Sequence, residues 1–164
     1  MNISQIMEKM IAFSNGNLHD INHFMCVWTY AKAIGELEGL DRKTQETLEI
    51  AAITHDIACP LCREKYGNTN GKWQEEEGGP LVRNFLADAG LSAEQVDRVA
   101  YLVSHHHTYT DIDGIDYQIL IEADYIVNAS ESGYSPENRK NFLEKHMKTE
   151  SGKRLLRSTF CMET

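Results

Sequence analysis

The sequence has little of what marks a secreted, membrane-spanning or disulfide-stabilised protein. Its four cysteines are too few to cross-link a chain of 164 residues, which agrees with a reducing compartment. No apolar run approaches the roughly 18 residues that a membrane span needs. The N-terminal segment also lacks the basic and apolar regions of a signal peptide. We therefore expect a cytoplasmic protein without a membrane partner.

Positive charge is also scarce. Sixteen basic residues stand against 25 acidic ones, which leaves a formal net charge of -9. There is no lysine- or arginine-rich run and no basic stripe with interleaved aromatic residues, so a nucleic acid polymer is not an expected partner. No repeat, linker or low-complexity tract divides the chain. We expect a single domain over residues 1–164, and the sequence leaves its oligomeric state open.

The cysteines Cys59 and Cys62 have the C-x-x-C spacing of thiol redox centres and of half a zinc site. A redox centre would follow a strand, whereas this pair follows a helical segment. No second cysteine pair completes a four-thiolate zinc site. The favoured interpretation is therefore that these cysteines are structural or incidental.

Strict alternation of apolar and polar residues is almost absent from the chain. Apolar residues recur instead at spacings of three and four, which is typical of amphipathic helices. This spacing predicts helices over residues 44–57 and 117–130, among others. Ser92 begins a further helix with the pattern of a capping box. The expected fold class is all-α.

The helical spacing disappears between residues 59 and 79, where glycine, asparagine, lysine and glutamate accumulate. This stretch predicts a long loop, and a long loop in a compact domain is often functional. Pro80 would then occupy the first position of the following helix, where a proline is well tolerated.

The dipeptide His55-Asp56 is the most informative feature of the chain. It ends the apolar stretch 48–54, and an adjacent acid and base are costly to bury unless something compensates them. A divalent metal compensates both at once. His23 in an earlier helical segment and Asp124 in a later one are further suitable ligands. The resulting order along the chain is His, His-Asp, Asp.

This order, with each motif on a separate expected helix, resembles the HD superfamily of metal-dependent phosphohydrolases. The likeness extends from about residue 20 to about residue 130 and is carried by the segments Asp20-Ile21-Asn22-His23, Thr54-His55-Asp56-Ile57-Ala58 and Glu122-Ala123-Asp124-Tyr125-Ile126-Val127. It implies an HD-like helical domain with a central metal site, in which one divalent metal is bound by His23, His55, Asp56 and Asp124. Two imidazoles and two carboxylates suit Mn, Fe, Co, Ni or Zn better than Mg or Ca.

Family members with two metals carry paired histidines, and the triplet His105-His106-His107 stands at the corresponding place. Successive helical side chains point about 100° apart, so only one or two of the three can face one site. We favour His106, then His105. Where two-metal members have one more histidine, this chain has a glutamate run that begins at Glu75. Whether a second metal binds is therefore left open, and Glu75 is either a second-metal ligand, a general acid/base or part of a solvated helix turn.

The resemblance implies hydrolysis of a phosphate ester in a small molecule, for which we expect a nucleotide or a nucleotide-like metabolite. The residues assigned to catalysis are Asp56, His106 and Glu75. Two alternatives stay open. The first is an HD-type di-iron oxygenase, which needs a fuller set of ligands for the second metal. The second is a non-catalytic module that binds metal or a nucleotide.

Four residues are candidates for substrate binding. Lys65 and Lys72 lie on the expected loop and could receive a phosphate, as could His105 beside the favoured His106. Tyr109 could stack on a base. Solvation of the loop lysines and closure of the core by the tyrosine explain the same residues without a ligand.

Overall fold

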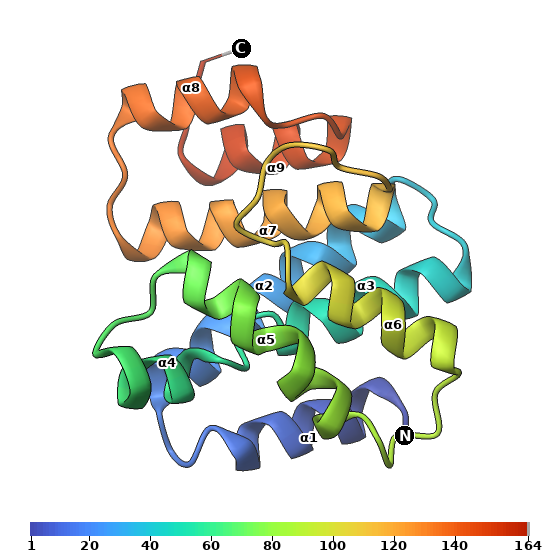
Figure 1. Ribbon diagram of the computed structural model, residues 1–164. Coiled ribbons are helices and arrows are strands. Elements are labelled where there is room, and N and C mark those ends of the chain that lie inside the picture. The colour runs from blue at the N-terminus through green and yellow to red at the C-terminus, as the bar shows by residue number, and fades with distance from the viewer. Residues whose placement is uncertain (164) are drawn as a thin grey trace.

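The computed structural model describes residues 1–163, and within this range the chain is all helical (Figure 1). This confirms the expected fold class. The helices are α1 (Ile3–Phe13), α2 (Leu18–Leu37), α3 (Arg42–Thr54), α4 (Cys59–Tyr66), α5 (Gly71–Phe85), α6 (Ala93–Val103), α7 (Ile115–Glu131), α8 (Pro136–Lys145) and α9 (Glu150–Thr159). None of them, within the described residues, is long and apolar enough to cross a membrane.

The centre of the domain is formed by α2, α3 and α7, which pack against one another. Every residue of α3 from Thr47 to Thr54 is buried, and so is most of α7. Around this centre, α1 and α6 pack against α3, α5 packs on α6, and α4 packs on α5. The C-terminal helices α8 and α9 lie at the opposite end of the domain from α1 (Figure 1). The three central helices are therefore the most rigid place on which to hold a site.

Side chains at the helix starts explain most of the helix boundaries. Asn2 and Gln5 form a capping box at α1, and the side chains of Asn17, Asp41 and Ser92 accept hydrogen bonds from the first turns of α2, α3 and α6. Each of these contacts satisfies a backbone donor that has no partner inside its helix. Ser92 thus begins α6, as its sequence pattern predicts.

The prediction of a loop over residues 59–79 is wrong. The stretch forms α4 and the first half of α5, and Pro80 lies inside α5 rather than at its first position. Of the glycines that suggested a loop, Gly67 ends α4 in the left-handed conformation, and Gly71, Gly78 and Gly79 serve close packing. A Cβ atom on Gly78 would come within 2.7 Å of Val103 Cγ1 on α6, so only glycine allows the two helices to approach this closely.

The predicted helix over residues 44–57 is also too long at its C-terminal end. The helix α3 ends at Thr54, and His55 is its C-cap. The chain then turns into α4 within a few residues, and this turn carries Asp56. The two residues of the dipeptide therefore lie at and beyond the end of the helix, where His55 Nε2 and Asp56 Oδ2 are 3.6 Å apart.

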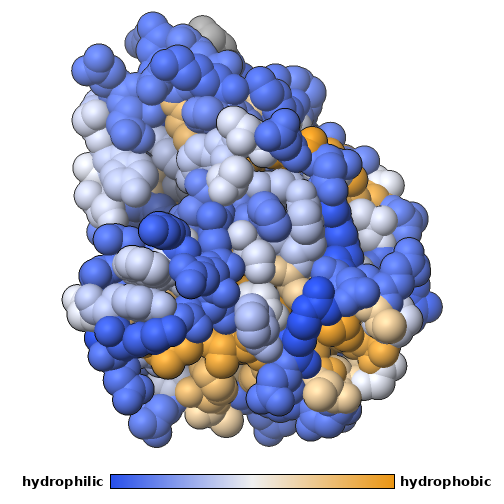
Figure 2. All heavy atoms as spheres, viewed as in Figure 1, coloured by the Kyte–Doolittle hydropathy of each residue, from blue (hydrophilic) through white to orange (hydrophobic). Residues whose placement is uncertain are grey.

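The surface in Figure 2 is mainly hydrophilic, with hydrophobic residues gathered toward the edge where α1 lies in Figure 1. Ile11 and Phe13 of α1 are among the exposed large hydrophobic residues.

Candidate metal centre

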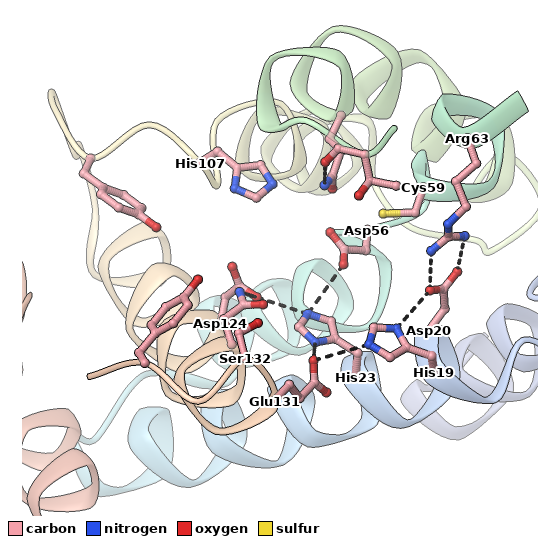
Figure 3. Close-up of a pocket in the computed structure, with 15 residues that line it drawn as sticks. His19, Asp20, His23, Asp56, Cys59, Arg63, His107, Asp124, Glu131 and Ser132 are labelled. Atoms are coloured by element: carbon pink, nitrogen blue, oxygen red, sulfur yellow. Dashed lines mark hydrogen bonds and ion pairs between the residues drawn. The ribbon is translucent and has the colours of Figure 1, made fainter. Parts of the chain in front are cut away.

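Four side chains from three parts of the fold converge at the centre of the domain. His23 projects from the middle of α2, Asp124 projects from α7, and His55 and Asp56 follow the end of α3. His23 Nε2 lies 3.2 Å from His55 Nε2 and 3.2 Å from Asp124 Oδ1. It also lies 3.5 Å from Asp56 Oδ2. Figure 3 shows His23, Asp56 and Asp124 turned toward one another. The structure thus brings together the four residues that the sequence selected as ligands.

The histidines of this cluster present lone pairs to its centre. His55 Nδ1 lies 2.8 Å from the carbonyl oxygen of Ala52, which can only accept a hydrogen bond, so Nδ1 carries the hydrogen. His23 Nδ1 lies 2.8 Å from Glu131 Oε2 and donates in the same way. In the neutral form of each ring, Nε2 therefore has a lone pair with which it can bind an ion. A carboxylate or carbonyl behind a ligating histidine is the usual arrangement around protein-bound metals.

The charge balance of the cluster also calls for a cation. Burial alone would raise the pKa of Asp124, but hydrogen bonds from His23 and His55 outweigh it and hold that pKa well below its usual value. Burial likewise opposes ionisation of Asp56, yet the neighbouring histidines lower its pKa as well. Two ionised carboxylates and two imidazole lone pairs repel one another unless a cation lies among them. This donor set fits a divalent transition metal.

A proton is the competing cation. Burial lowers the pKa of His23, but its hydrogen bond to Asp124 and the charges of Asp56 and Asp124 prevail and raise it to about 10. His23 without a metal therefore holds a proton at neutral pH. An ion that binds here has to displace it.

A second group of ligand atoms adjoins the first. Asp56, His106 and His107 offer one atom each, and these atoms lie within 4.8 Å of one another. Neither His106 Nε2 nor His107 Nε2 has a hydrogen-bond partner among residues 1–163, although both atoms are buried. Burial and the nearby charge of His106 lower the pKa of His107 to about 4, so that its ring is neutral. Asp56 could thus be shared between two ions.

The member of the histidine triplet that lies beside His106 at the site is not the one we predicted. His105, our second choice after His106, donates a hydrogen bond from Nδ1 to the carbonyl oxygen of Tyr101 at 2.7 Å, and its ring stacks on Tyr101. His107 takes the place beside His106 instead. The reason is that α6 ends at Val103, so the following turn rotates these side chains away from helical positions.

Three of the four residues, His23, Asp56 and Asp124, line a cavity of about 300 Å³, and the fully buried His55 lies behind them. Arg63 from α4 also lines it and makes two hydrogen bonds to Asp20, at 2.6 and 2.8 Å (Figure 3). Of the four residues predicted to bind substrate, Tyr109 lines the cavity. Among the described residues, Lys65, Lys72 and His105 do not belong to its lining.

The two lysines have partners elsewhere. Lys65 forms an ion pair with Glu77, which also accepts a hydrogen bond from the hydroxyl of Tyr66. Lys72 lies over the ring of Trp73, 4.7 Å from its centroid. These contacts follow from the helical structure of residues 59–79, which the sequence pattern did not reveal.

Glu75 faces the turn that follows α6. Its Oε1 accepts hydrogen bonds from the backbone amide of His107 at 3.1 Å and from the hydroxyl of Thr108 at 2.9 Å. Its neighbour Gln74 is the residue of this segment that lines the cavity. The structure therefore places Glu75 where it orients the turn that carries His107.

Sequence reasoning missed Glu131, which holds His23, and the role of Asn128, which donates to Asp124 Oδ1 at 2.9 Å. Both lie on α7, where Asn128 is four and Glu131 seven residues after Asp124. Residues at these spacings share one face of a helix, so this spacing was the available signal. The sequence did not indicate a role for Gln74, because the apolar spacing of a helix is lost around it.

An all-α domain with buried histidines and aspartates on one wall of a cavity has the arrangement of a helical metal-dependent hydrolase. The HD domain model matches residues 20–151, and the chain belongs to this family. Membership and the cluster together support a hydrolase that binds a divalent metal.

Among solved structures, the chain is similar to a protein of an uncultured Thermotogales bacterium that is described as a predicted HD superfamily hydrolase. The two chains are 20% identical, and their superposition has a TM-score of 0.70. The match covers 96% of this chain and 84% of the other. At this identity the likeness concerns the fold. No curated protein matches the sequence.

Proposed function

We propose that the protein hydrolyses a phosphate ester of a small, nucleotide-like molecule. The observation that carries this proposal is the cluster of His23, His55, Asp56 and Asp124, three of which line a cavity that a small molecule can enter. A divalent ion, when bound there, would acidify water and polarise a phosphoryl oxygen.

Arg63 is the residue best suited to receive the phosphate. The cavity is otherwise acidic, since Asp20 and Glu131 line it together with the aspartates of the cluster. The two hydrogen bonds to Asp20 hold the guanidinium in place but use only two of its five donors. The remaining donors can bind phosphate oxygens, and a planar guanidinium does so with good geometry. This role replaces the one expected for Lys65 and Lys72.

Asp56 and His106 supply a place to hold a proton. Asp56 Oδ1 lies 3.4 Å from His106 Nε2, and the His106 side chain is fully buried. Burial alone would lower the pKa of His106, but the close contact with the Asp56 carboxylate and its negative charge outweigh burial and raise that pKa. His106 can therefore hold a proton at Nε2 and give it to a leaving oxygen.

A nucleotide-like substrate is supported by an aromatic cavity beside the metal cavity. This second cavity, of about 250 Å³, is lined by Tyr125, Phe142 and His146 together with Tyr109 and Tyr134. The last two residues line both cavities. A planar base can stack against such a ring while its phosphate lies at the metal centre.

One observation favours a second candidate function. The group of Asp56, His106 and His107 could hold a second ion beside the first, as a di-iron oxygenase requires. This group offers three ligand atoms, and one of them comes from Asp56, which also belongs to the first group. We therefore rank oxygenase chemistry below hydrolysis. A non-catalytic role would leave the proton-holding pair without a use.

A phosphatase screen tests the proposal. The protein is stripped with a chelator, reloaded separately with Mn, Fe, Co, Ni or Zn, and offered nucleotides, sugar phosphates and dinucleotides. We expect phosphate release with at least one metal and none from the double variant His55→Ala, Asp56→Ala. No turnover of any phosphate together with oxygen consumption by the iron-loaded protein would refute hydrolysis in favour of oxygenase chemistry.

A further inference from the structure

Gln74 has a buried amide on the wall of the metal cavity. This amide has no part in the hydrolysis proposed for the site. Gln74 lies in the first turn of α5, and only 5% of its surface is exposed. It lines the cavity together with Asp56, His107 and Thr69.

The orientation of the Gln74 amide is determined by its neighbour. Nε2 donates a hydrogen bond to the carbonyl oxygen of Thr69 at 2.8 Å. A carbonyl oxygen cannot donate, so the nitrogen and not the oxygen of the amide must face Thr69. Oε1 is therefore the atom that is left over, and it has no hydrogen-bond partner among residues 1–163. A buried acceptor without a partner is unusual and destabilising, which points to a partner from outside the chain.

The chemistry of that partner follows from Oε1, which can only accept. An ionised phosphate has no hydrogen to donate, so it is excluded. A base amino group could donate, but the aromatic cavity suited to a base is lined by Tyr109 and Tyr134 and not by Gln74. A water molecule can donate to Oε1 when no substrate is bound, and the donors of a nucleotide-like molecule that can replace it are the hydroxyls of its sugar.

We propose that Gln74 determines specificity by accepting, at Oε1, a hydrogen bond from a sugar hydroxyl of the substrate. This inference rests on the proposed function, because it assumes a phosphate ester that carries a sugar. A site built to bind a hydroxyl rejects an analogue without it, since the buried acceptor is then left unpaired.

The test compares ribonucleoside 5′-monophosphates with their 2′-deoxy and 3′-deoxy counterparts on Mn-loaded protein. We expect kcat/KM to fall roughly 10- to 100-fold when one particular hydroxyl is removed, as for the loss of one buried hydrogen bond. In Gln74→Met, which keeps the length of the side chain without its acceptor, the two compounds should be hydrolysed equally. On a phosphate ester without a sugar, p-nitrophenyl phosphate, this variant should lose much less activity than on the hydroxyl-bearing nucleotide.

Gln95→Met is the matched control. Gln95 is 8% exposed and also has an unpartnered amide atom, but it lies in a groove beside α3 and α6, away from the metal cavity. It should retain the full preference for the hydroxyl. Equal treatment of all the sugars by the unaltered protein would overturn the inference even if Gln74→Met failed to fold. An equal loss on every substrate, p-nitrophenyl phosphate included, would overturn it too.

Calorimetric binding of the same compounds separates this inference from the proposed function. If no phosphate is released but the hydroxyl-bearing compound binds at least tenfold more tightly, and this difference disappears in Gln74→Met, hydrolysis is refuted and the role of Gln74 stands. If phosphate is released without any preference for a hydroxyl, hydrolysis stands and the role of Gln74 is refuted. Absence of both turnover and binding refutes both.

Discussion

We expect Glu131 to control the metal affinity of the cluster, although it is not one of the four proposed ligands. Its Oε2 accepts a hydrogen bond from His23 Nδ1 at 2.8 Å, and its side chain is 29% exposed. This contact keeps the hydrogen on Nδ1 and leaves Nε2 for the ion. Removing a partner of this kind usually weakens metal binding by about 10- to 100-fold. For Glu131→Ala we therefore expect a loss of about 1.4 to 2.7 kcal/mol.

The assay is a titration against a chromophoric chelator of known affinity. Glu131→Gln should lose less than Glu131→Ala, because an amide oxygen can still accept from Nδ1. Thermal unfolding gives a second measurement. At a fixed excess of metal, each tenfold rise in the dissociation constant should remove about 1.4 kcal/mol of the stabilisation by the ion, measured for each variant against its own metal-free form.

Glu137→Ala, at an exposed position in α8, is the control and should bind metal normally. The reasoning fails if Glu131→Ala binds the ion within twofold of the unaltered protein. It also fails if the control loses as much affinity, because the effect would then come from the net charge of the protein.

Three further predictions concern packing, pH and catalysis. Gly78→Ala should destabilise the protein by about 1 to 3 kcal/mol, because its Cβ would meet Val103 Cγ1 at 2.7 Å; urea unfolding measures this, and an unchanged midpoint would contradict the close packing of α5 on α6. The raised pKa of His23, about 10, means that a proton bound to His23 must leave before the metal binds. Metal affinity should therefore increase with pH up to that value, by about tenfold per pH unit for one proton. A dissociation constant that does not change with pH would exclude this competition. His106→Ala should lower kcat by about 10²- to 10⁴-fold with the first metal still bound. Glu75→Ala should affect activity only by loosening the turn that contains His107. Metal content and kinetics measured on the same samples distinguish loss of a proton donor from loss of a metal ligand.

The sequence alone determined the helical class and the order of the metal ligands. Both are written in local patterns: apolar residues at spacings of three and four, capping side chains such as Ser92, and the motifs around His23, His55-Asp56 and Asp124. These signals depend on a residue and its near neighbours, so they survive without knowledge of the fold.

Only the tertiary structure decided which neighbours of these motifs face the cavity. Gln74 lines it and Glu75 does not, and His107 rather than His105 stands beside His106. Successive residues of a helix point about 100° apart, so an error of one residue in a boundary or an alignment turns a side chain away from the site.

The helical structure of residues 59–79 was decided in the same way. Glycines such as Gly78 weaken a helix when it is considered alone, and the sequence pattern therefore indicated a loop. In the folded protein, the absence of a side chain at Gly78 lets α5 lie close against Val103 of α6. That gain exists only when both helices are present, since it arises from contact between segments that are distant in the sequence.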